Sequence, residues 1–253
     1  VFKLTSSYDN LISNWMNNES SDLKIINHEK KTLRYGENPH QKSFFYESKS
    51  KNNLFKNYIQ PDKKLSFNNI LDINSACELL NEFIEPTCAI IKHNIPSGVA
   101  SDSKIEKAYL KAYDSDPTSA FGGIVALNRK INEKIACKLI SKFFDIIVAP
   151  SFSKKSILIL KRKKRLILIE TEKISEDKRF EVKSVHSGYL VQEKNKIIFS
   201  KKNMKCVSNK KATDKQINDL IFAFKISKYT KSNAIVLVQN KQTIGIGSGQ
   251  TSR

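Results

Sequence analysis

The stretch Cys88–Ala100, Cys-Ala-Ile-Ile-Lys-His-Asn-Ile-Pro-Ser-Gly-Val-Ala, decides how the rest of the chain is interpreted. Its first four residues are small or apolar and rich in β-branched side chains, which predicts a short buried strand. Lys92 and His93 follow this run directly. Behind them come three residues that interrupt regular structure, Asn94, Pro96 and Gly98. We therefore expect a cation and an imidazole at the carboxyl end of a buried strand, on a loop held by turn residues.

The position of this Lys-His pair is compatible with a binding or catalytic role. Ligands of open α/β sheets bind at the carboxyl ends of strands. Histidine titrates near neutral pH, and a neighbouring lysine can stabilise a developing negative charge. An ordinary strand-to-loop exit with a solvated lysine remains the alternative on these residues alone, because a Lys-His pair is a weak motif.

Length and composition indicate a globular chain. It has 253 residues, of which 40% are hydrophobic, enough for one large or two medium domains. The four cysteines are scattered without a Cys-x-x-Cys motif, which predicts reduced thiols and argues against a disulfide framework or a zinc cluster. We find no signal peptide and no apolar run near 18 residues, and expect a cytoplasmic protein. The chain starts without Met inside a helical pattern and looks like a segment of something longer.

The net charge of +19 raises the possibility of a nucleic-acid-binding module. The lysines, however, are spread through the whole chain. The one dense basic run, residues 161–165, lies between two apolar stretches and has no interleaved aromatic residues for base stacking. It therefore predicts a solvated loop between a helix and a strand, and nucleic-acid binding is kept only as a remote alternative.

Hydrophobic periodicity predicts alternating helices and strands along most of the chain. The expected helices cover residues 1–19, 71–83, 105–112, 131–143 and 217–224. The expected strands cover residues 88–91, 124–127, 145–148, 166–170, 185–192, 196–200 and 234–238, the last of them buried. This alternation is typical of an α/β protein with a parallel or mixed sheet and helices on its faces.

Other polar or glycine-rich loops fall at the ends of these elements. Residues 31–41 contain Arg34, Tyr35, His40 and Gln41, and arginine suits bidentate contact with phosphate. Residues 114–123 end in Gly122-Gly123, and residues 244–253 form a glycine-rich loop that ends in Arg253. Together with the Lys-His pair, these loops favour a site for a phosphorylated small molecule.

Five motifs now identify a resemblance. They are Arg34-Tyr-Gly-Glu-Asn-Pro-His-Gln41, Lys92-His93 with Pro96 and Gly98, Asp116-Pro-Thr-Ser-Ala-Phe-Gly-Gly123, Lys231-Ser-Asn-Ala-Ile235 and Ile244-Gly-Ile-Gly-Ser-Gly-Gln250. Their order and spacing resemble the bifunctional AICAR transformylase/IMP cyclohydrolase family of purine biosynthesis. The motifs are long and span nearly the whole chain, so the resemblance is specific.

The resemblance implies a fold and a division into domains. The fold would be α/β, built from two cytidine-deaminase-like α/β/α units, the first complete and the second incomplete. Residues 1–20 would be the tail of the cyclohydrolase domain with a linker, residues 21–200 the first unit, and residues 201–253 the start of the second. The zinc motifs of deaminases, Pro-Cys-x-x-Cys and His-x-Glu, are absent from the sequence, and no metal is expected.

The implied reaction transfers the formyl group of 10-formyltetrahydrofolate, the cosubstrate, to the 5-amino group of AICAR, giving FAICAR. Cyclohydrolase catalysis is not carried over, because almost none of that domain matches. The family further implies a cytoplasmic homodimer with a shared active site, acting on a nucleotide and a folate, with no nucleic acid or membrane as partner. A nucleotide-binding remnant without catalysis remains an alternative.

The same resemblance assigns roles to residues. His93 would act in general acid–base catalysis, and Lys92 and Asn233 would stabilise the formyl oxygen. Which of Lys92 and His93 moves the proton to the folate nitrogen is left open. Six residues would bind the nucleotide, with Arg34 at its phosphate: Arg34, Tyr35, Phe121, Gly122, Asp145 and Arg253. The sequence departs from the family pattern at Ile95 and Ser97, where Asn and Cys are usual.

Overall fold

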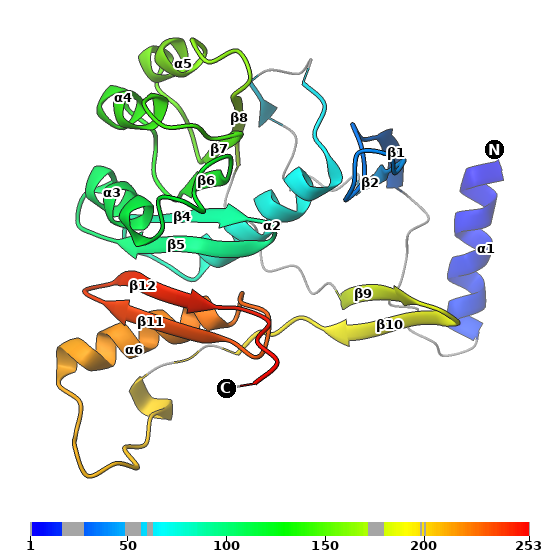
Figure 1. Ribbon diagram of the computed structural model, residues 1–253. Helices are drawn as coiled ribbons and strands as arrows, with labels where there is room; N and C mark the ends of the chain where they lie inside the picture. Colours follow the sequence, from blue (N-terminus) through cyan, green and yellow to red (C-terminus); the bar gives the residue numbers. More distant parts are fainter. Residues whose placement is uncertain are drawn as a thin grey trace.

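The computed structural model describes residues 2–16, 28–48, 57–59, 63–171, 180–197, 199 and 201–252. Among these residues, eight strands form one mixed sheet with helices on both faces (Figure 1). The helices are α1 (Phe2–Met16), α2 (Phe67–Asn81), α3 (Ile105–Ser115), α4 (Glu133–Ile140), α5 (Lys154–Leu160) and α6 (Asp214–Ser227), with a 3₁₀ turn, η1 (Lys201–Asn203). The expected α/β class with a mixed sheet is confirmed.

The strands of the large sheet are given in their spatial order. They are β11 (Ile235–Gln239), β12 (Gln242–Gly247), β5 (Ile95–Ser101), β4 (Thr87–Lys92), β6 (Ile124–Leu127), β7 (Ile146–Ala149), β8 (Ile167–Glu170) and β3 (Asn57–Tyr58). Two hairpins stand apart from this sheet, β1 (His28–Thr32) with β2 (Phe44–Ser48) and β9 (Phe180–Val185) with β10 (Gly188–Glu193). In the described part of the chain, no helix is long and apolar enough to cross a membrane.

Strand directions decide which loops meet. β6, β7 and β8 run parallel to one another, whereas β4 is antiparallel to both of its neighbours, β5 and β6. β4 therefore ends at the edge of the sheet where β6 and β7 begin. Lys92 lies at the carboxyl end of its strand, as predicted, but the loops beside it lead into the amino ends of the parallel strands.

Strands β6 and β7 and the middle of β4 are apolar and buried because helices cover both faces of the sheet. Alternate residues of β4 point to opposite faces. Cys88 and Ile90 belong to the buried cluster under α3, α4 and α5, and Ala89 and Ile91 belong to the cluster under α2 and α6. This two-sided burial explains why residues 88–91 form an uninterrupted apolar run.

A helix followed by a two-stranded hairpin occurs twice in the structure. In the first copy α2 precedes β4 and β5, and in the second α6 precedes β11 and β12. Both helices start with a capping box, Ser66 with Asn69 and Thr213 with Gln216. The same number of residues separates Ser66 from Thr213 as separates Asp72 from Asp219, so the two aspartates hold equivalent positions in their helices. This repeat is what a fold of two related units predicts, while the deaminase-like description and the domain boundaries remain predictions.

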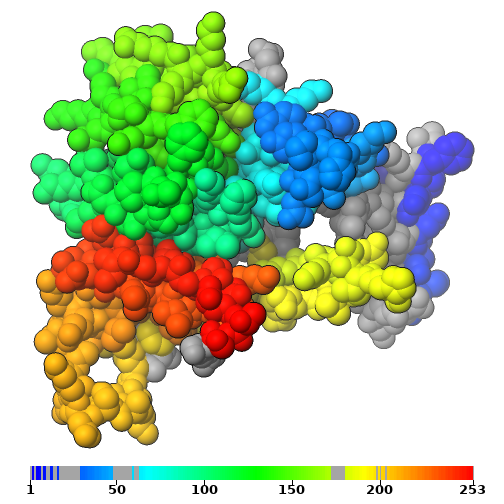
Figure 2. Space-filling view, viewed as in Figure 1, coloured from blue at the N-terminus to red at the C-terminus, as the bar shows by residue number. Residues whose placement is uncertain are grey.

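The two copies meet edge to edge. β12 pairs antiparallel with β5, with Gln242 opposite Ala100. The buried hydroxyl of Thr243 adds hydrogen bonds to the backbone of Val99, which donates to it at 2.9 Å and accepts from it at 3.2 Å. Figure 2 shows the second copy, orange to red, lying against the green body of the first.

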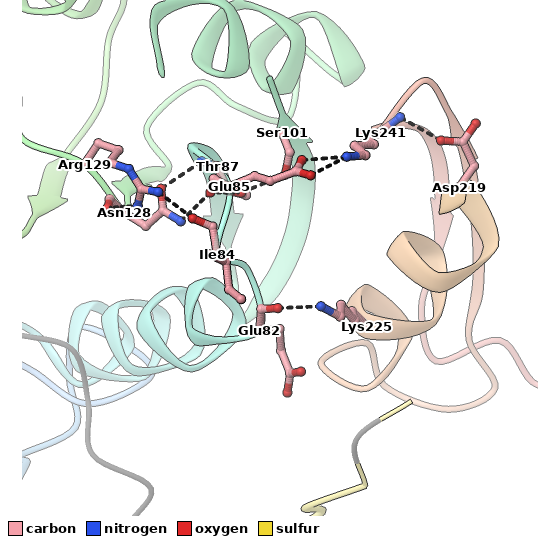
Figure 3. A network of polar contacts seen from close by, with 10 residues as sticks. All are labelled: Glu82, Ile84, Glu85, Thr87, Ser101, Asn128, Arg129, Asp219, Lys225 and Lys241. Carbon is pink, nitrogen blue, oxygen red and sulfur yellow. Dashed lines mark hydrogen bonds and ion pairs between the residues drawn. The ribbon is translucent and has the colours of Figure 1, made fainter. Parts of the chain in front are cut away.

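Polar contacts at the end of α2 hold α6 and the second hairpin in place (Figure 3). The carboxylate of Glu82 accepts hydrogen bonds from Lys228 Nζ at 2.7 Å and Tyr229 Oη at 2.9 Å. The backbone oxygen of Glu82 accepts from Lys225 Nζ at 2.6 Å. Glu85 pairs with Lys241 in the turn between β11 and β12. The Lys228–Glu82 pair is largely buried, so removing one partner would leave an uncompensated charge.

Several predicted elements differ from the structure. The strand expected across residues 185–192 is confirmed for residues 188–192, which lie in β10, but its start is wrong, because a turn at His186 and Ser187 separates β10 from β9. The described part of residues 196–200 contains no strand. β11 is an edge strand with three of its five residues exposed and none buried, not a buried strand. Gly245 and Gly247 belong to β12, so the expected glycine loop is confined to the residues after 247.

Gly98 provides a test of the packing between β5 and α3. A Cβ atom at this position would lie 2.0 Å from the carbonyl oxygen of Ala112 in α3. Gly98→Ala should therefore lower the free energy of unfolding by about 1–3 kcal/mol, as overpacked cores do. The thermal midpoint should fall by about 2–4 °C for each kcal/mol.

The matched control is Gly188→Ala in β10, where a Cβ would meet nothing within 4 Å. This variant should unfold with the wild-type midpoint. Equal midpoints for the two variants in a thermal or urea titration would contradict the close approach of β5 and α3.

Candidate active site

The turn between β4 and β5 carries the Lys-His pair. The two strands pair as far as Lys92 opposite Ile95, leaving His93 and Asn94 as a two-residue connection. Both turn residues have positive φ, 52° and 63°. Two-residue hairpins of type I′ require this conformation at both central positions, and histidine and asparagine tolerate it better than most residues. Lys92 is half-buried, and His93 lies exposed at the tip.

The loop predicted to follow His93 is wrong. Pro96 and Gly98 belong to β5, which continues to Ser101. The register shifts between Ile90 and Ile91, so that Ser97 is an extra residue in the ladder. Such a bulge accommodates proline, because the missing N–H interrupts a ladder that is already irregular. The site is therefore built on a hairpin of paired strands and not on a long loop.

Lys92 is tied to the loop that precedes β6. Its Nζ donates a hydrogen bond to the carbonyl oxygen of Phe121 at 2.8 Å. Gly122 has a φ of 71°, a conformation that favours glycine, and its N–H donates to the carbonyl oxygen of Phe143 at 3.0 Å. The ring of Phe121 stacks on that of Phe143 with centroids 4.8 Å apart, yet remains 62% exposed. The loop thus presents an accessible aromatic face beside Lys92.

Arg34 and Tyr35 reach the same edge of the sheet from the loop after β1. The N–H of Arg34 donates to the carbonyl oxygen of Leu65 at 2.9 Å, and the N–H of Phe67 donates to that of Tyr35 at 3.1 Å. These bonds anchor the loop at the start of α2. The Arg34 guanidinium donates to the Tyr35 hydroxyl at 2.7 Å and stays exposed.

Asp145 joins Arg34 and Lys92 electrostatically. It lies directly before β7, and its N–H donates to the carbonyl oxygen of Gly123 at 3.2 Å. Desolvation raises the pKa of its carboxyl above the usual value, while the positive charges of Arg34 and Lys92 oppose that rise. Residues far apart in the sequence are thereby brought into one charged cluster.

Asn233 lies at the same edge of the sheet, in the second copy. Because β12 is antiparallel to β5, the end of β12 and the start of β11 fall on the side of the His93–Asn94 turn. The side chain of Asn233 donates from Nδ2 to the carbonyl oxygen of Gln250 at 3.1 Å. Arg253 lies outside the described residues, so its predicted role is not tested.

Sequence analysis missed Asp72. This carboxylate is 8% exposed and accepts a hydrogen bond from the N–H of Asn94 at 2.5 Å. The sequence contained a signal for it, because Asp72 precedes Ala76, Leu79 and Leu80 at helical spacing and so lies on the buried stripe of α2. A charged residue on such a stripe needs a buried partner.

The arrangement offers cations, a carboxylate, an imidazole and an exposed aromatic ring at one edge. It suits recognition of an anionic ligand and proton transfer. In the part of the chain that the structure describes, no group of three or more His, Cys, Asp or Glu side chains is placed to hold a metal ion.

Comparison with known proteins decides the family. The family model described as AICARFT/IMPCHase bienzyme matches residues 1–253. The chain belongs to this family. It is 46% identical over 259 residues to the bifunctional purine biosynthesis protein PurH of Thermoanaerobacter sp. (strain X514). It is 44% identical over 264 residues to the protein of the same description from Ruminiclostridium cellulolyticum. Each match covers 100% of this chain and 51% of the relative, so the chain spans about half the length of these relatives.

Charge coupling between Lys92 and Asp145 gives a test of the site that needs no substrate. Lys92→Met removes a positive charge that lowers the pKa of the Asp145 carboxyl, so that pKa should rise further. The side-chain carboxyl carbon of Asp145 reports this directly in an NMR pH titration. Lys210→Met, an exposed lysine of the segment before α6, is the control and should leave the titration unchanged. An unaltered titration curve of Asp145 in Lys92→Met would contradict the electrostatic coupling between the two residues.

Proposed function

We propose that this chain carries the formyl-transfer chemistry of its family, moving the formyl group of 10-formyltetrahydrofolate to the 5-amino group of AICAR to give FAICAR. The observation that carries the proposal is the meeting of Lys92, His93, Arg34 and Asp145 at one edge of the sheet. The relatives' description as bifunctional purine biosynthesis proteins supports it.

His93 is the proposed general acid–base. The 5-amino group of AICAR is a poor nucleophile, because its lone pair is delocalised into the imidazole ring and the carboxamide. It must lose a proton as the new C–N bond forms. A positioned histidine contributes about 10²–10⁴-fold to such a step. His93 is exposed at the tip of the hairpin, which supports its access to a substrate.

Lys92 and Asn233 are proposed to stabilise the formyl oxygen, which gains negative charge in the transition state. The Lys92 ammonium has three N–H donors and uses one on the Phe121 carbonyl oxygen. That bond fixes its direction while leaving donors for an oxyanion. The Asn233 amide comes from the other copy of the repeat, so the proposed site needs both copies docked.

The remaining residues are proposed to bind the nucleotide. The Arg34 guanidinium suits bidentate contact with the phosphate, and Tyr35 orients that guanidinium through its hydroxyl. The exposed ring of Phe121 and the open backbone at Gly122 suit close approach of a flat heterocycle. Asp145 can accept hydrogen bonds from hydroxyl or amino groups, and Arg253 is kept as a further cation. A homodimer with a shared site and a cytoplasmic location belong to the same proposal.

Removal of either member of the Lys-His pair tests the mechanism. In the gene product at its full natural length, His93→Ala and Lys92→Ala should each lower kcat for AICAR-dependent tetrahydrofolate release by about 10²–10⁴-fold. Circular dichroism should show that both variants remain folded, because neither side chain is part of the core. Turnover at the wild-type rate in either variant would refute the proposed mechanism.

Arg34→Ala tests nucleotide binding. Loss of hydrogen bonds to a charged phosphate costs about 1.5–3 kcal/mol, so the Kd for AICAR monophosphate should rise by about 10- to 100-fold in calorimetry. Arg129→Ala is the matched control: this exposed arginine bonds the carbonyl oxygens of Ile84 and Asn128, away from the site, and its loss should leave Kd unchanged. Wild-type protein that binds the nucleotide without any turnover would instead support a nucleotide-binding fragment.

A further inference from the structure

Asp72 is a buried carboxylate that contacts the turn bearing His93. It projects from α2 and accepts the N–H of Asn94 at 2.5 Å. The backbone N–H of His93 is a second donor to the same carboxylate. On the next turn of the helix, the hydroxyl of Ser75 bonds the side-chain oxygen of Asn94. Helix α2 therefore holds the turn residues through their backbone and through one side chain.

The turn needs such a partner because its conformation is unfavourable. His93 and Asn94 both lie in the left-handed region, which side chains bearing a Cβ rarely adopt. In a two-residue hairpin loop these N–H groups point away from the ladder. A carboxylate that accepts both of them stabilises the left-handed pair against other loop conformations. The left-handed conformation sets the direction of the Cα–Cβ bond of His93. It therefore also sets where the imidazole lies.

The second copy of the repeat contains the same arrangement without the Lys-His pair. Asp219 of α6 accepts the N–H groups of Asn240 and Lys241 at 2.9 and 2.8 Å. Those two residues also have positive φ, both 54°. In each copy the aspartate precedes the second turn residue by 22 positions. The carboxylate that closes the turn is thus a feature of the repeated unit, and only in the first copy does the turn carry His93.

We propose that Asp72 is a positioning residue for the reaction: by accepting the backbone N–H groups of the turn, it fixes the orientation of the His93 imidazole. This inference rests on the proposed function of His93. Asp72 acts through the backbone of the turn and does not touch the substrate.

The charges around Asp72 agree with this role. Desolvation raises the pKa of its carboxyl, and the nearby charge of Asp145 raises it too. The N–H groups of His93 and Asn94 and the charge of His93 act in the opposite direction, favouring the carboxylate. The N–H groups of the turn and the charge of His93 thus offset part of the pKa rise that desolvation causes, so the turn and the carboxylate that closes it stabilise each other.

The repeat supplies the experiment, carried out on the gene product at its full natural length. Asp72→Ala and Asp219→Ala remove equivalent backbone bonds from equivalent turns, so both should lower the thermal midpoint of unfolding. Only Asp72→Ala should lower kcat for formyl transfer, by about 10²-fold, the loss expected when a catalytic group is misplaced by about 1 Å. KM for AICAR should stay near the wild-type value, because Arg34 and Phe121 are untouched.

Asp72→Asn keeps one oxygen acceptor and should restore part of kcat, which also covers the case in which Asp72→Ala does not fold. A wild-type kcat in either Asp72 variant that folds, or an equal kcat loss in Asp219→Ala, overturns the proposal. The proposed function fails separately, if the wild-type protein and Asp219→Ala both lack formyl transfer.

Discussion

The hairpin of β4 and β5, buried on both faces and closed by a helix carboxylate, is the feature on which the rest of the structure depends. Helices cover each face of these strands, so their register and direction are fixed by packing. The left-handed turn at His93 and Asn94 is stabilised by Asp72 from α2. Because β4 runs against β6, the turn meets the loops that lead into β6 and β7. The meeting of Lys92 with Asp145 follows from that antiparallel pairing together with the parallel pairing of β6 and β7.

The same unit appears twice, and the site depends on how the copies join. The inner strands β5 and β12 pair antiparallel, which puts the two turns at opposite edges of the sheet. Asn233 therefore comes to the edge occupied by His93, although it belongs to the second copy. Few ladder bonds join β5 to β12, and the hydrogen bond from Lys225 of α6 to the backbone oxygen of Glu82 adds to them (Figure 3). The Glu82 carboxylate also accepts hydrogen bonds from Lys228 and Tyr229, directly after α6. Docking of the second copy is thus coupled to completion of the proposed site.

Much of the fold could be predicted from local patterns. The alternation of apolar stripes and runs located α2, α3, β4, β6 and β8 to within a few residues, because burial on one or both faces leaves a strong periodic signal. The failures share a cause. Pro96 and Gly98 predicted a loop, yet a bulge and the close approach of α3 accommodate both within β5. The edge strand β11 was expected to be buried, because its composition does not reveal that only one face is covered.

The sequence by itself determined the α/β class, the elements with strong periodicity and, through five long motifs, the family and the residues to test. Tertiary structure alone decided which of those residues meet. Lys92 and Asp145 are brought together by strand order, and Asp72 reaches the turn from a helix that lies earlier in the chain. The equivalence of Asp72 and Asp219 also became visible only in three dimensions. The reason is physical. Periodicity in the sequence indicates whether a residue is buried, whereas strand pairing and helix packing determine which residues it contacts.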